Sequence, residues 1–272
     1  MLNQSFSKPG WVVPGCLVAC LLLAGQAPMP EPVTDQETQL GSAVFQELKD
    51  GGQIIASSPL YDFLNPITTP IVRVAQTRYE HPFKFVLVHD AKPNAFSAPG
   101  GNVYVTDSFL YFVSNAEELA GTLCHELAHT IHHDAMDRIR ENQKIGKVQI
   151  GAMILFGPSL AQAIAMDFLA DLRSKAYSRE IESRADITGA DTCVAAGYNP
   201  YGLMWLFQDF KDSGQKQIPE ILSDHPSHEA RIRALEVHFR EHPGAFSRFS
   251  SDRKQATPLR VPEDAPVAFL RR

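Results

Sequence analysis

A histidine-rich stretch at residues 121–134, GTLCHELAHTIHHD, restricts what this 272-residue chain can fold into more than any other feature. Ser114 and Glu117 form a helix-capping pattern in front of it. Apolar residues then recur at every fourth position, at Leu119, Leu123, Leu127 and Ile131. This spacing predicts one helix whose apolar side faces the core. His125 and His129 are four residues apart, so the helix places both imidazoles on one face.

The HELAH segment has the pattern of a zinc-peptidase site. In an H-E-x-x-H motif the two histidines bind zinc. The glutamate takes a proton from zinc-bound water and later gives it to the leaving amine. His125 and His129 are therefore candidate zinc ligands, and Glu126 is the candidate catalytic base. The motif fixes only three positions, so a third ligand has to come from elsewhere in the chain.

Two arrangements can supply the third ligand. A metzincin has H-E-x-x-H-x-x-G-x-x-H, but this chain has His132 at the glycine position and Ala135 at the last histidine position, which excludes that arrangement. The alternative is a glutamate from a second helix, and the segment SREIESRAD supplies Glu182. Two histidines and one glutamate leave a fourth position open for water. Asp186, one turn later, can hydrogen-bond the outer nitrogen of a ligand histidine, and Gly189 on the same face would let the two helices approach closely.

The remaining pattern predicts a mainly helical α+β fold with a small sheet beside the HExxH helix. Apolar spacing indicates further helices over residues 34–48, 69–79, 178–196, 199–210 and 229–240. Strand patterns cover residues 83–90 and 102–107, with a turn signal at Pro99, Gly100 and Gly101 between them. Residues 148–170 are strongly apolar but interrupted at Gly157 and Pro158, which favours a helical hairpin or buried cover over a transmembrane segment.

The first 27 residues resemble an export signal. Residues 11–25 are almost wholly apolar, but as a helix they would span roughly 22 Å, less than the ~30 Å core of a bilayer. The segment LVAC resembles a bacterial lipobox in which Cys20 would be lipidated, whereas the small residues that end at Ala27 fit ordinary cleavage. We therefore expect an exported chain that is either periplasmic or attached to an envelope membrane through a lipidated Cys20.

Residues 28–243 are expected to form the zinc metallopeptidase domain. Residues 244–272 are expected to be a loosely structured tail, because they contain several prolines and no sustained periodicity. The formal charge of −6 is spread without long runs of one sign, which argues against a nucleic-acid partner. Cys124 and Cys193 lack the spacing of a zinc ribbon or disulfide framework. Buried thiols are the simpler interpretation, and a bridge in an oxidising compartment remains open.

Four blocks, in order, resemble a known family of zinc peptidases: NAFSAPGGNVYV, CHELAH, YSREIESRAD and DHPSHEARI. Together they resemble the gluzincin endopeptidases that include HtpX, the CAAX prenyl proteases, the mitochondrial Oma-type peptidase and BepA. The resemblance covers about residues 34–240. It implies one zinc ion per chain, held by His125, His129 and Glu182, with Glu126 as the catalytic base and Asp186 behind the ligands.

The same resemblance implies a role for His225 in the H-P segment, either in stabilising the oxyanion or in closing the site as a fourth ligand. His132 and His133 are expected to be exposed polar residues rather than ligands. Asp134 stands where relatives often have histidine. We expect Asp134 to lie beyond the ligands and to leave the chemistry unchanged.

Residues 102–107 are expected to form either an ordinary strand of the sheet or, as in other zinc peptidases, an edge strand that holds an extended substrate by strand addition. The candidate substrate-binding residues are Asn94, Gly101, Asn102, Val103 and Tyr104. The sequence thus predicts a zinc-dependent endopeptidase that hydrolyses unfolded or misassembled envelope proteins. The alternative is a zinc-stabilised chaperone or assembly factor with latent proteolytic activity.

Overall fold

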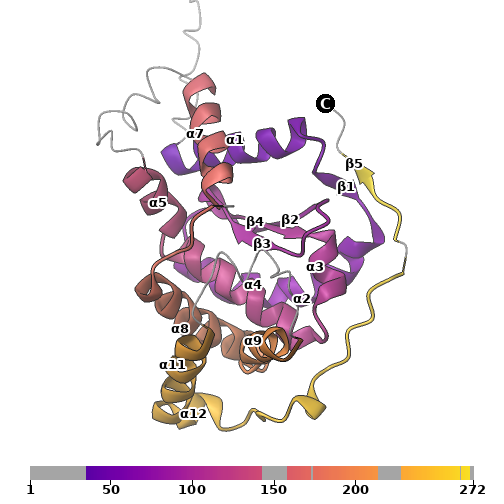
Figure 1. Ribbon diagram of the computed structural model, residues 1–272, viewed down its shortest axis with the longest axis vertical. Helices are drawn as coiled ribbons and strands as arrows, with labels where there is room; N and C mark the ends of the chain where they lie inside the picture. Colours follow the sequence, from indigo (N-terminus) through magenta and orange to yellow (C-terminus); the bar gives the residue numbers. More distant parts are fainter. Residues whose placement is uncertain (1–34, 143–157, 173, 214–227, 264, 270–272) are drawn as a thin grey trace, which may run out of the picture. The chain divides into compact units, whose positions relative to one another are not determined.

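Helix α4 (Ala116–Ile131) is buried along almost its whole length and anchors the fold (Figure 1). The structure is a computed structural model that describes residues 35–142, 158–172, 174–213, 228–263 and 265–269. The helices that pack on α4 include α2 (Pro59–Ala75), α8 (Arg179–Ala196) and α9 (Gly202–Ser213). The leucines of the four-residue repeat have no exposed surface and supply the core side of α4, as predicted.

A three-stranded sheet lies beside α4. Its order is β2, β4, β3, with β2 and β4 parallel and β3 antiparallel to β4. The strands are β2 (Lys84–Val88), β3 (Ala95–Ser97) and β4 (Asn102–Thr106). Because β3 is the strand that packs on α4 most extensively, the β3 edge of the sheet meets the helix that carries HELAH.

Alternating side chains of the sheet belong to two separate cores. Leu87, Val103 and Val105 join the cluster that contains the leucines of α4. Val86 and Tyr104 join a second cluster with α1 and α7 on the other face of the sheet. The helices of this second layer are α1 (Gln36–Asp50) and α7 (Pro158–Leu172). The sheet is therefore covered on both faces, and α4 lies on one of them.

The prediction that residues 102–107 form an edge strand is wrong. Strand β4 lies between β2 and β3, so its backbone groups pair on both sides. Val103 and Tyr104 are completely buried, which leaves them no surface for a substrate. The alternating pattern of residues 102–107 indicates a strand but does not give its neighbours. The edge strands of this sheet are β2 and β3. The one beside α4, β3, has only three residues and shows no period.

Helix α4 begins one residue later than the capping pattern predicted. The side chain of Asn115 accepts a hydrogen bond from the backbone N–H of Glu118 (2.9 Å), and the Glu118 carboxylate accepts one from the N–H of Ser114 (2.8 Å). Asn115 is thus the N-cap. Glu117 instead accepts hydrogen bonds from the N–H and hydroxyl of Thr257, each at 2.8 Å.

The contact with Thr257 belongs to a C-terminal segment that is docked, contrary to the expectation of a loose tail. Arg253 in this segment binds Glu118 at 2.8 Å. The carbonyl oxygen of Pro262 accepts a hydrogen bond from the hydroxyl of Tyr111 (2.8 Å), and the end of the segment, yellow in Figure 1, pairs with β1. Its elements are α12 (Pro243–Phe246), η3 (Arg253–Gln255) and β5 (Ala268–Phe269), and its partner is β1 (Ile55–Ser57). One compact unit therefore extends from Thr34 to Arg272.

The fold class is confirmed as mainly helical α+β with a small sheet beside the HExxH helix. The other helices are η1 (Gln76–Arg78), η2 (Pro99–Gly101), α3 (Asp107–Phe112), α5 (Asp134–Asn142) and α11 (His228–Glu241). Helix α2 starts ten residues before the predicted helix at 69–79, with Pro66 and Pro70 inside it. Within the described residues, no helix combines the length and apolar character that a bilayer crossing needs. The first 27 residues, where an export signal is expected, and residues 148–157 lie outside the described part of the chain.

Candidate metal centre

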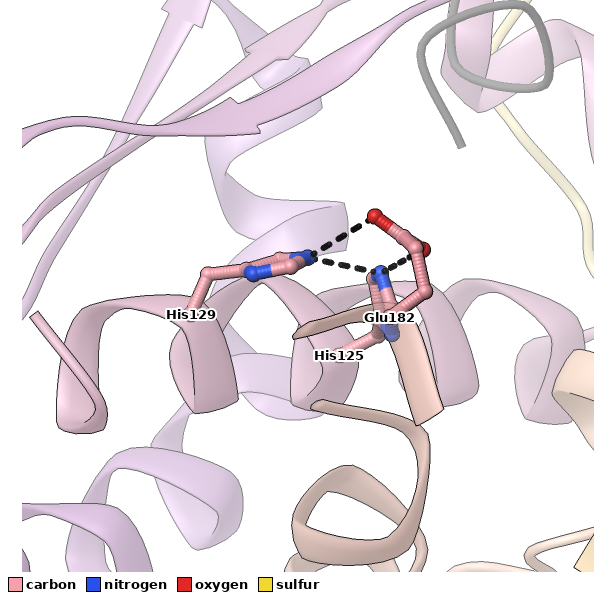
Figure 2. Close-up of side chains that lie close together, drawn as sticks. All are labelled: His125, His129 and Glu182. Atoms are coloured by element: carbon pink, nitrogen blue, oxygen red, sulfur yellow. Dashed lines mark hydrogen bonds and ion pairs between the residues drawn. The ribbon is translucent and has the colours of Figure 1, made fainter. Parts of the chain in front are cut away.

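Three side chains from two helices converge on one point. His125 and His129 come from α4 and Glu182 from α8, and Figure 2 shows them facing one another. The two Nε2 atoms are 3.0 Å apart. One oxygen of Glu182 is 3.5 Å from Nε2 of His125, and the other is 3.7 Å from Nε2 of His129. All three residues are buried. The structure thus brings together the three side chains that the sequence singled out.

The outer nitrogen of each histidine contacts a carboxylate. Nδ1 of His125 is 3.0 Å from Asp186, and Nδ1 of His129 is 2.8 Å from Asp134. Because a carboxylate accepts the Nδ1 proton, the lone pair of a neutral imidazole is left on Nε2. Two acceptor nitrogens at 3.0 Å repel each other unless a cation, either a proton or a metal ion, lies between them. The arrangement is therefore built around a positive charge.

The donor set fits zinc. Two nitrogens that each lie 2.0–2.1 Å from a tetrahedral zinc are roughly 3.3 Å apart, and the nitrogen and oxygen atoms here are 3.0 to 3.7 Å apart. Two histidines and one glutamate are also a set used by catalytic zinc sites. Burial and the charge of Arg231 lower the pKa of His125, but contacts with Asp186 and Glu182 outweigh them and raise it to about 9.

Glu126 is held by the edge strand of the sheet. Its Oε2 accepts a hydrogen bond from the backbone N–H of Ser97 in β3 (3.0 Å), and only 1% of Glu126 is exposed. The carbonyl oxygen of Asn94 accepts a hydrogen bond from the N–H of Thr106, and the N–H of Ala98 donates one to the carbonyl oxygen of Asn102, so both residues face β4. In an antiparallel pair the backbone groups of successive residues face opposite sides of the strand. The backbone groups of Ala95 and Ser97 therefore face away from β4, toward α4. The backbone edge of β3 therefore lies beside the carboxylate of Glu126.

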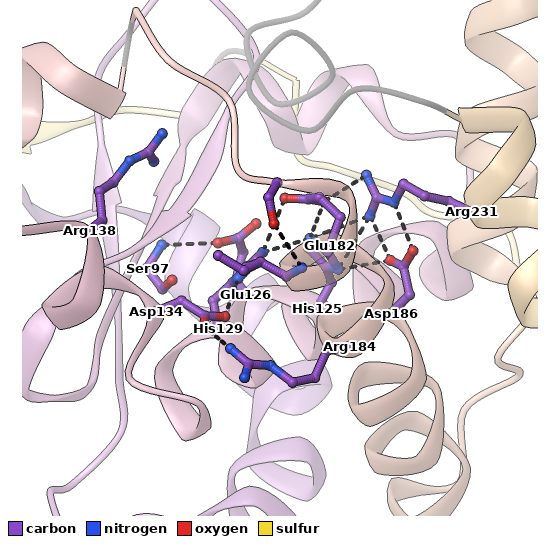
Figure 3. A network of polar contacts seen from close by, with 12 residues as sticks. Ser97, His125, Glu126, His129, Asp134, Arg138, Glu182, Arg184, Asp186 and Arg231 are labelled. Carbon is purple, nitrogen blue, oxygen red and sulfur yellow. Dashed lines mark hydrogen bonds and ion pairs between the residues drawn. The ribbon is translucent and has the colours of Figure 1, made fainter. Parts of the chain in front are cut away.

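Arg231 is a part of the centre that the sequence analysis missed. Its guanidinium donates to both oxygens of Asp186, at 2.6 and 2.7 Å, and lies 3.0 Å from Glu182 (Figure 3). Burial raises the pKa of Asp186, but Arg231 and His125 together outweigh it and lower the pKa below its ordinary value. Arg231, Leu235 and Phe239 are buried at four-residue intervals on α11. A charged residue at an apolar position of a helix was the signal that could have revealed this role.

Asp134 is also closer to the centre than expected. It is 1% exposed, contacts His129 directly and forms an ion pair with Arg184 of α8 (Figure 3). The expectation that Asp134 lies beyond the ligands and leaves the chemistry unchanged is therefore wrong about its position. The side chain lies at the first turn of α5, and the chain reverses before it at His133, whose φ is 56°. This turn brings Asp134 back onto the end of α4.

Asp134→Asn is expected to weaken zinc affinity about ten- to a hundredfold, the range for losing a carboxylate behind a ligand histidine. The amide keeps the shape of the aspartate side chain but lacks the negative charge beside Nδ1 of His129. Zinc affinity can be measured by competition with a coloured chelator. Asp137→Asn is the matched control, because Asp137 lies on the same helix but has a side chain that is 60% exposed and pairs only with Arg140 among the described ion pairs. Equal zinc affinities in the two variants would contradict the assigned position of Asp134.

The other candidate residues that the structure describes do not line the centre. His132 contacts Thr188 of α8 (2.8 Å) and His133 contacts Glu37 of α1 (3.0 Å), so both are bonded to other helices and half-buried rather than fully exposed. Asn94 donates its backbone N–H to Thr106. Gly101 has φ 88°, and a Cβ there would lie 2.5 Å from the carbonyl oxygen of Pro82, so glycine is needed for the turn. His225 lies outside the described residues.

Comparison with known proteins points to one family. The model of peptidase family M48 matches residues 64–238. The beta-barrel assembly-enhancing protease of Escherichia coli (strain K12) is 24% identical over 207 residues, which are 72% of this chain and 42% of that protein. The protein of the same name from Yersinia pestis is 25% identical over 226 residues, 78% of this chain and 46% of its own length.

A mitochondrial relative matches as well. The human metalloendopeptidase OMA1 is 29% identical over 157 residues, which are 53% of this chain and 30% of that protein. The chain thus spans less than half the length of these relatives. The match to the family model covers well over half of the chain and includes α4, α8 and the convergent histidines and glutamate. The chain belongs to peptidase family M48.

Proposed function

We propose that this metalloendopeptidase uses one zinc ion to hydrolyse peptide bonds in unfolded or misassembled proteins of a bacterial envelope. The observation that carries the proposal is the buried convergence of His125, His129 and Glu182, with Glu126 beside them on the same helix. We assign the first three as zinc ligands and Glu126 as the proton acceptor. Asp186 and Asp134 orient the two histidines.

The proposed metal, Glu126 and Ser97 have separate roles in the hydrolysis. Zinc, when bound, supplies Lewis-acid chemistry that polarises the peptide carbonyl and makes water acidic near neutral pH. Glu126 takes the proton of the attacking water and gives it to the leaving amine. The N–H of Ser97 holds the Glu126 carboxylate by one oxygen. Because Glu126 is buried, bulk water does not compete for that proton.

Strand β3 is the strand nearest to Glu126, because the N–H of Ser97 donates a hydrogen bond to its carboxylate. Ala95 and Ser97 are themselves buried, with 0% and 3% of their surface exposed, so neither β3 nor β4 offers an open edge to a substrate among the described residues. The proposal of unfolded protein as the substrate class therefore rests on the similarity to family M48 and not on a substrate-binding strand.

The envelope location rests on two separate features. The first 27 residues have the pattern of an export signal, with Cys20 as a possible lipid-attachment site. Two relatives are named beta-barrel assembly-enhancing proteases. We accordingly place this chain in the periplasm or on an envelope membrane, and we assign it a role in protein quality control.

Cleavage of unfolded casein is expected to fall by more than tenfold when the metal is removed with a chelator, and to return when zinc is added. Metal content and product formation should be followed in the same samples. Folded proteins of similar size serve as the control and should remain intact. If the zinc-loaded chain suppresses aggregation of unfolded protein but never cleaves it, the alternative of a zinc-stabilised chaperone is correct instead.

A further inference from the structure

Two cysteines outside the metal centre lie unusually close together. Cys124 on α4 and Cys193 on α8 have their Sγ atoms 2.6 Å apart, although both are free thiols in the structure. This separation is well inside the van der Waals contact of two sulfur atoms and approaches the length of a disulfide bond, which is about 2.05 Å. The two thiols are held where a bond between them needs only a small adjustment.

The packing of the two helices explains this proximity. A Cβ at Gly189 would lie 3.0 Å from both N and Cα of His125, so the backbones of α4 and α8 are almost in contact there. Cys193 lies one helical turn after Gly189 on the same face. Its sulfur is also 3.4 Å from the carbonyl oxygen of Ala120. The close approach therefore extends along both helices and is not confined to the two sulfur atoms.

The pair is adjacent to the metal centre. Cys124 directly precedes His125, and Cys193 lies on the face of α8 that carries Glu182 and Asp186. A covalent bond between the two sulfurs would fix the separation of the helices that supply all three proposed ligands. Its effect on the fold can be measured without any peptidase assay.

We propose that Cys124 and Cys193 form a disulfide bond when the chain folds in an oxidising compartment. One thiolate attacks the disulfide of an oxidant, such as oxidised glutathione, forms a mixed disulfide and releases one thiol. The second thiolate attacks the sulfur of the first cysteine and releases the second thiol. The two cysteines lose two protons and two electrons, and the oxidant is reduced to two thiols.

Burial determines when the bond forms. Cys124 is completely buried and Cys193 is 1% exposed, so an oxidant cannot reach either sulfur in the folded chain. The exchange therefore takes place before α4 and α8 close on each other. For the same reason, a reductant reaches the finished bond only when the two helices separate. The bond is structural and is not a reversible switch.

Peptide mapping tests the bond directly. The full chain is refolded with oxidised glutathione, its remaining thiols are alkylated in denaturant, and it is digested without reduction. The peptides that contain Cys124 and Cys193 are expected to appear joined, two hydrogens lighter than the sum of the free peptides. Peptide identity separates this bond from pairs that involve Cys16 or Cys20. Recovery of both peptides in the alkylated form would overturn the proposal.

Dithiothreitol tests the enclosure of the bond. The linked peptides are expected to survive treatment of the native chain and to disappear when guanidinium is present. Equal rates of reduction with and without guanidinium would overturn the inference that the bond is enclosed by the packed helices.

Thermal unfolding supplies a second, independent test. The bond closes a loop between residues that are 69 positions apart, and its loss is expected to lower Tm by about 5 to 15 °C. Cys124→Ala, Cys193→Ala and the double variant should then share nearly one Tm, because each change removes the same bond. Losses that add in the double variant would show two independent thiols and overturn the proposal. If the variants do not fold, the parent refolded with and without oxidised glutathione gives the same Tm difference.

Discussion

Glu126→Gln is expected to retain zinc at the level of the parent chain and to lower the turnover of unfolded casein by about 10² to 10⁴. The amide has nearly the shape of the carboxylate, so it can still accept a hydrogen bond from Ser97, which holds Glu126 at 3.0 Å. It cannot take a proton from water at neutral pH. The loss should therefore appear in kcat, with KM and zinc content nearly unchanged.

Two comparison variants make this result specific. Glu182→Ala should lose most of its zinc along with its activity, because it removes a proposed ligand rather than the proton acceptor. Glu236→Gln, an exposed position on α11, should match the parent in both measurements. Substantial casein cleavage by Glu126→Gln at full zinc content would remove Glu126 from its assigned role.

Arg231→Met is expected to lower the free energy of unfolding by about 3 to 5 kcal/mol, the typical cost of removing one partner of a buried ion pair. Arg231 is 3% exposed and contacts both Asp186 and Glu182. Methionine fills much of the volume but leaves the carboxylates in the interior without their cation. Denaturant unfolding of the zinc-free protein measures this difference, since bound zinc would partly replace the lost charge.

The effect of Arg231→Met should depend on pH. Since Arg231 helps to lower the pKa of folded Asp186, this stabilisation is complete above the unfolded value of about 3.9. It is lost as the pH falls through the folded pKa. The difference between parent and variant should therefore be largest at neutral pH and should shrink in acid.

Two further variants test this assignment of Arg231. Arg233→Met should change stability by less than about 0.5 kcal/mol, because the Arg233 side chain is 69% exposed and its ion pair with Glu229 is 3.9 Å long. Arg231→Met combined with Asp186→Asn should recover part of the loss, since one unpaired charge is then absent. Equal stability of the two arginine variants would show that the ion pairs of Arg231 do not stabilise the fold.

The sequence predicted the parts of the centre that depend on short spacings. HELAH on a helix with a four-residue apolar repeat gave α4, and the second helix contributed Glu182 and Asp186 at the spacing of one turn. Gly189 was expected to allow a close approach, and the structure shows that approach at His125. Local periodicity determines which side chains share a face, and that was sufficient for the three convergent residues.

Features that depend on distant partners were not predictable in the same way. The order of the strands follows from tertiary packing, so the position of β3 at the edge was missed. Arg231 binds residues 45 positions away, and Thr257 binds Glu117 across 140 positions. Pro66 and Pro70 concealed the length of α2, because proline inside a helix usually breaks it. In α2 each proline removes one helical hydrogen bond, and tertiary contacts stabilise the rest of the helix.

Gly189 has a consequence for which ions the centre can select. The distance between the two candidate ligands His125 and His129 is set within one helix, but the distance from them to Glu182 is set by how near α8 can come to α4. That limit is the hydrogen atom at Gly189, where a methyl group would already meet the backbone of His125 at 3.0 Å. The span available to an ion is therefore determined at a position that bears no ligand. Any larger residue at position 189 would push α8 away from α4 and lengthen the distance from His125 and His129 to Glu182, while every proposed ligand stayed the same.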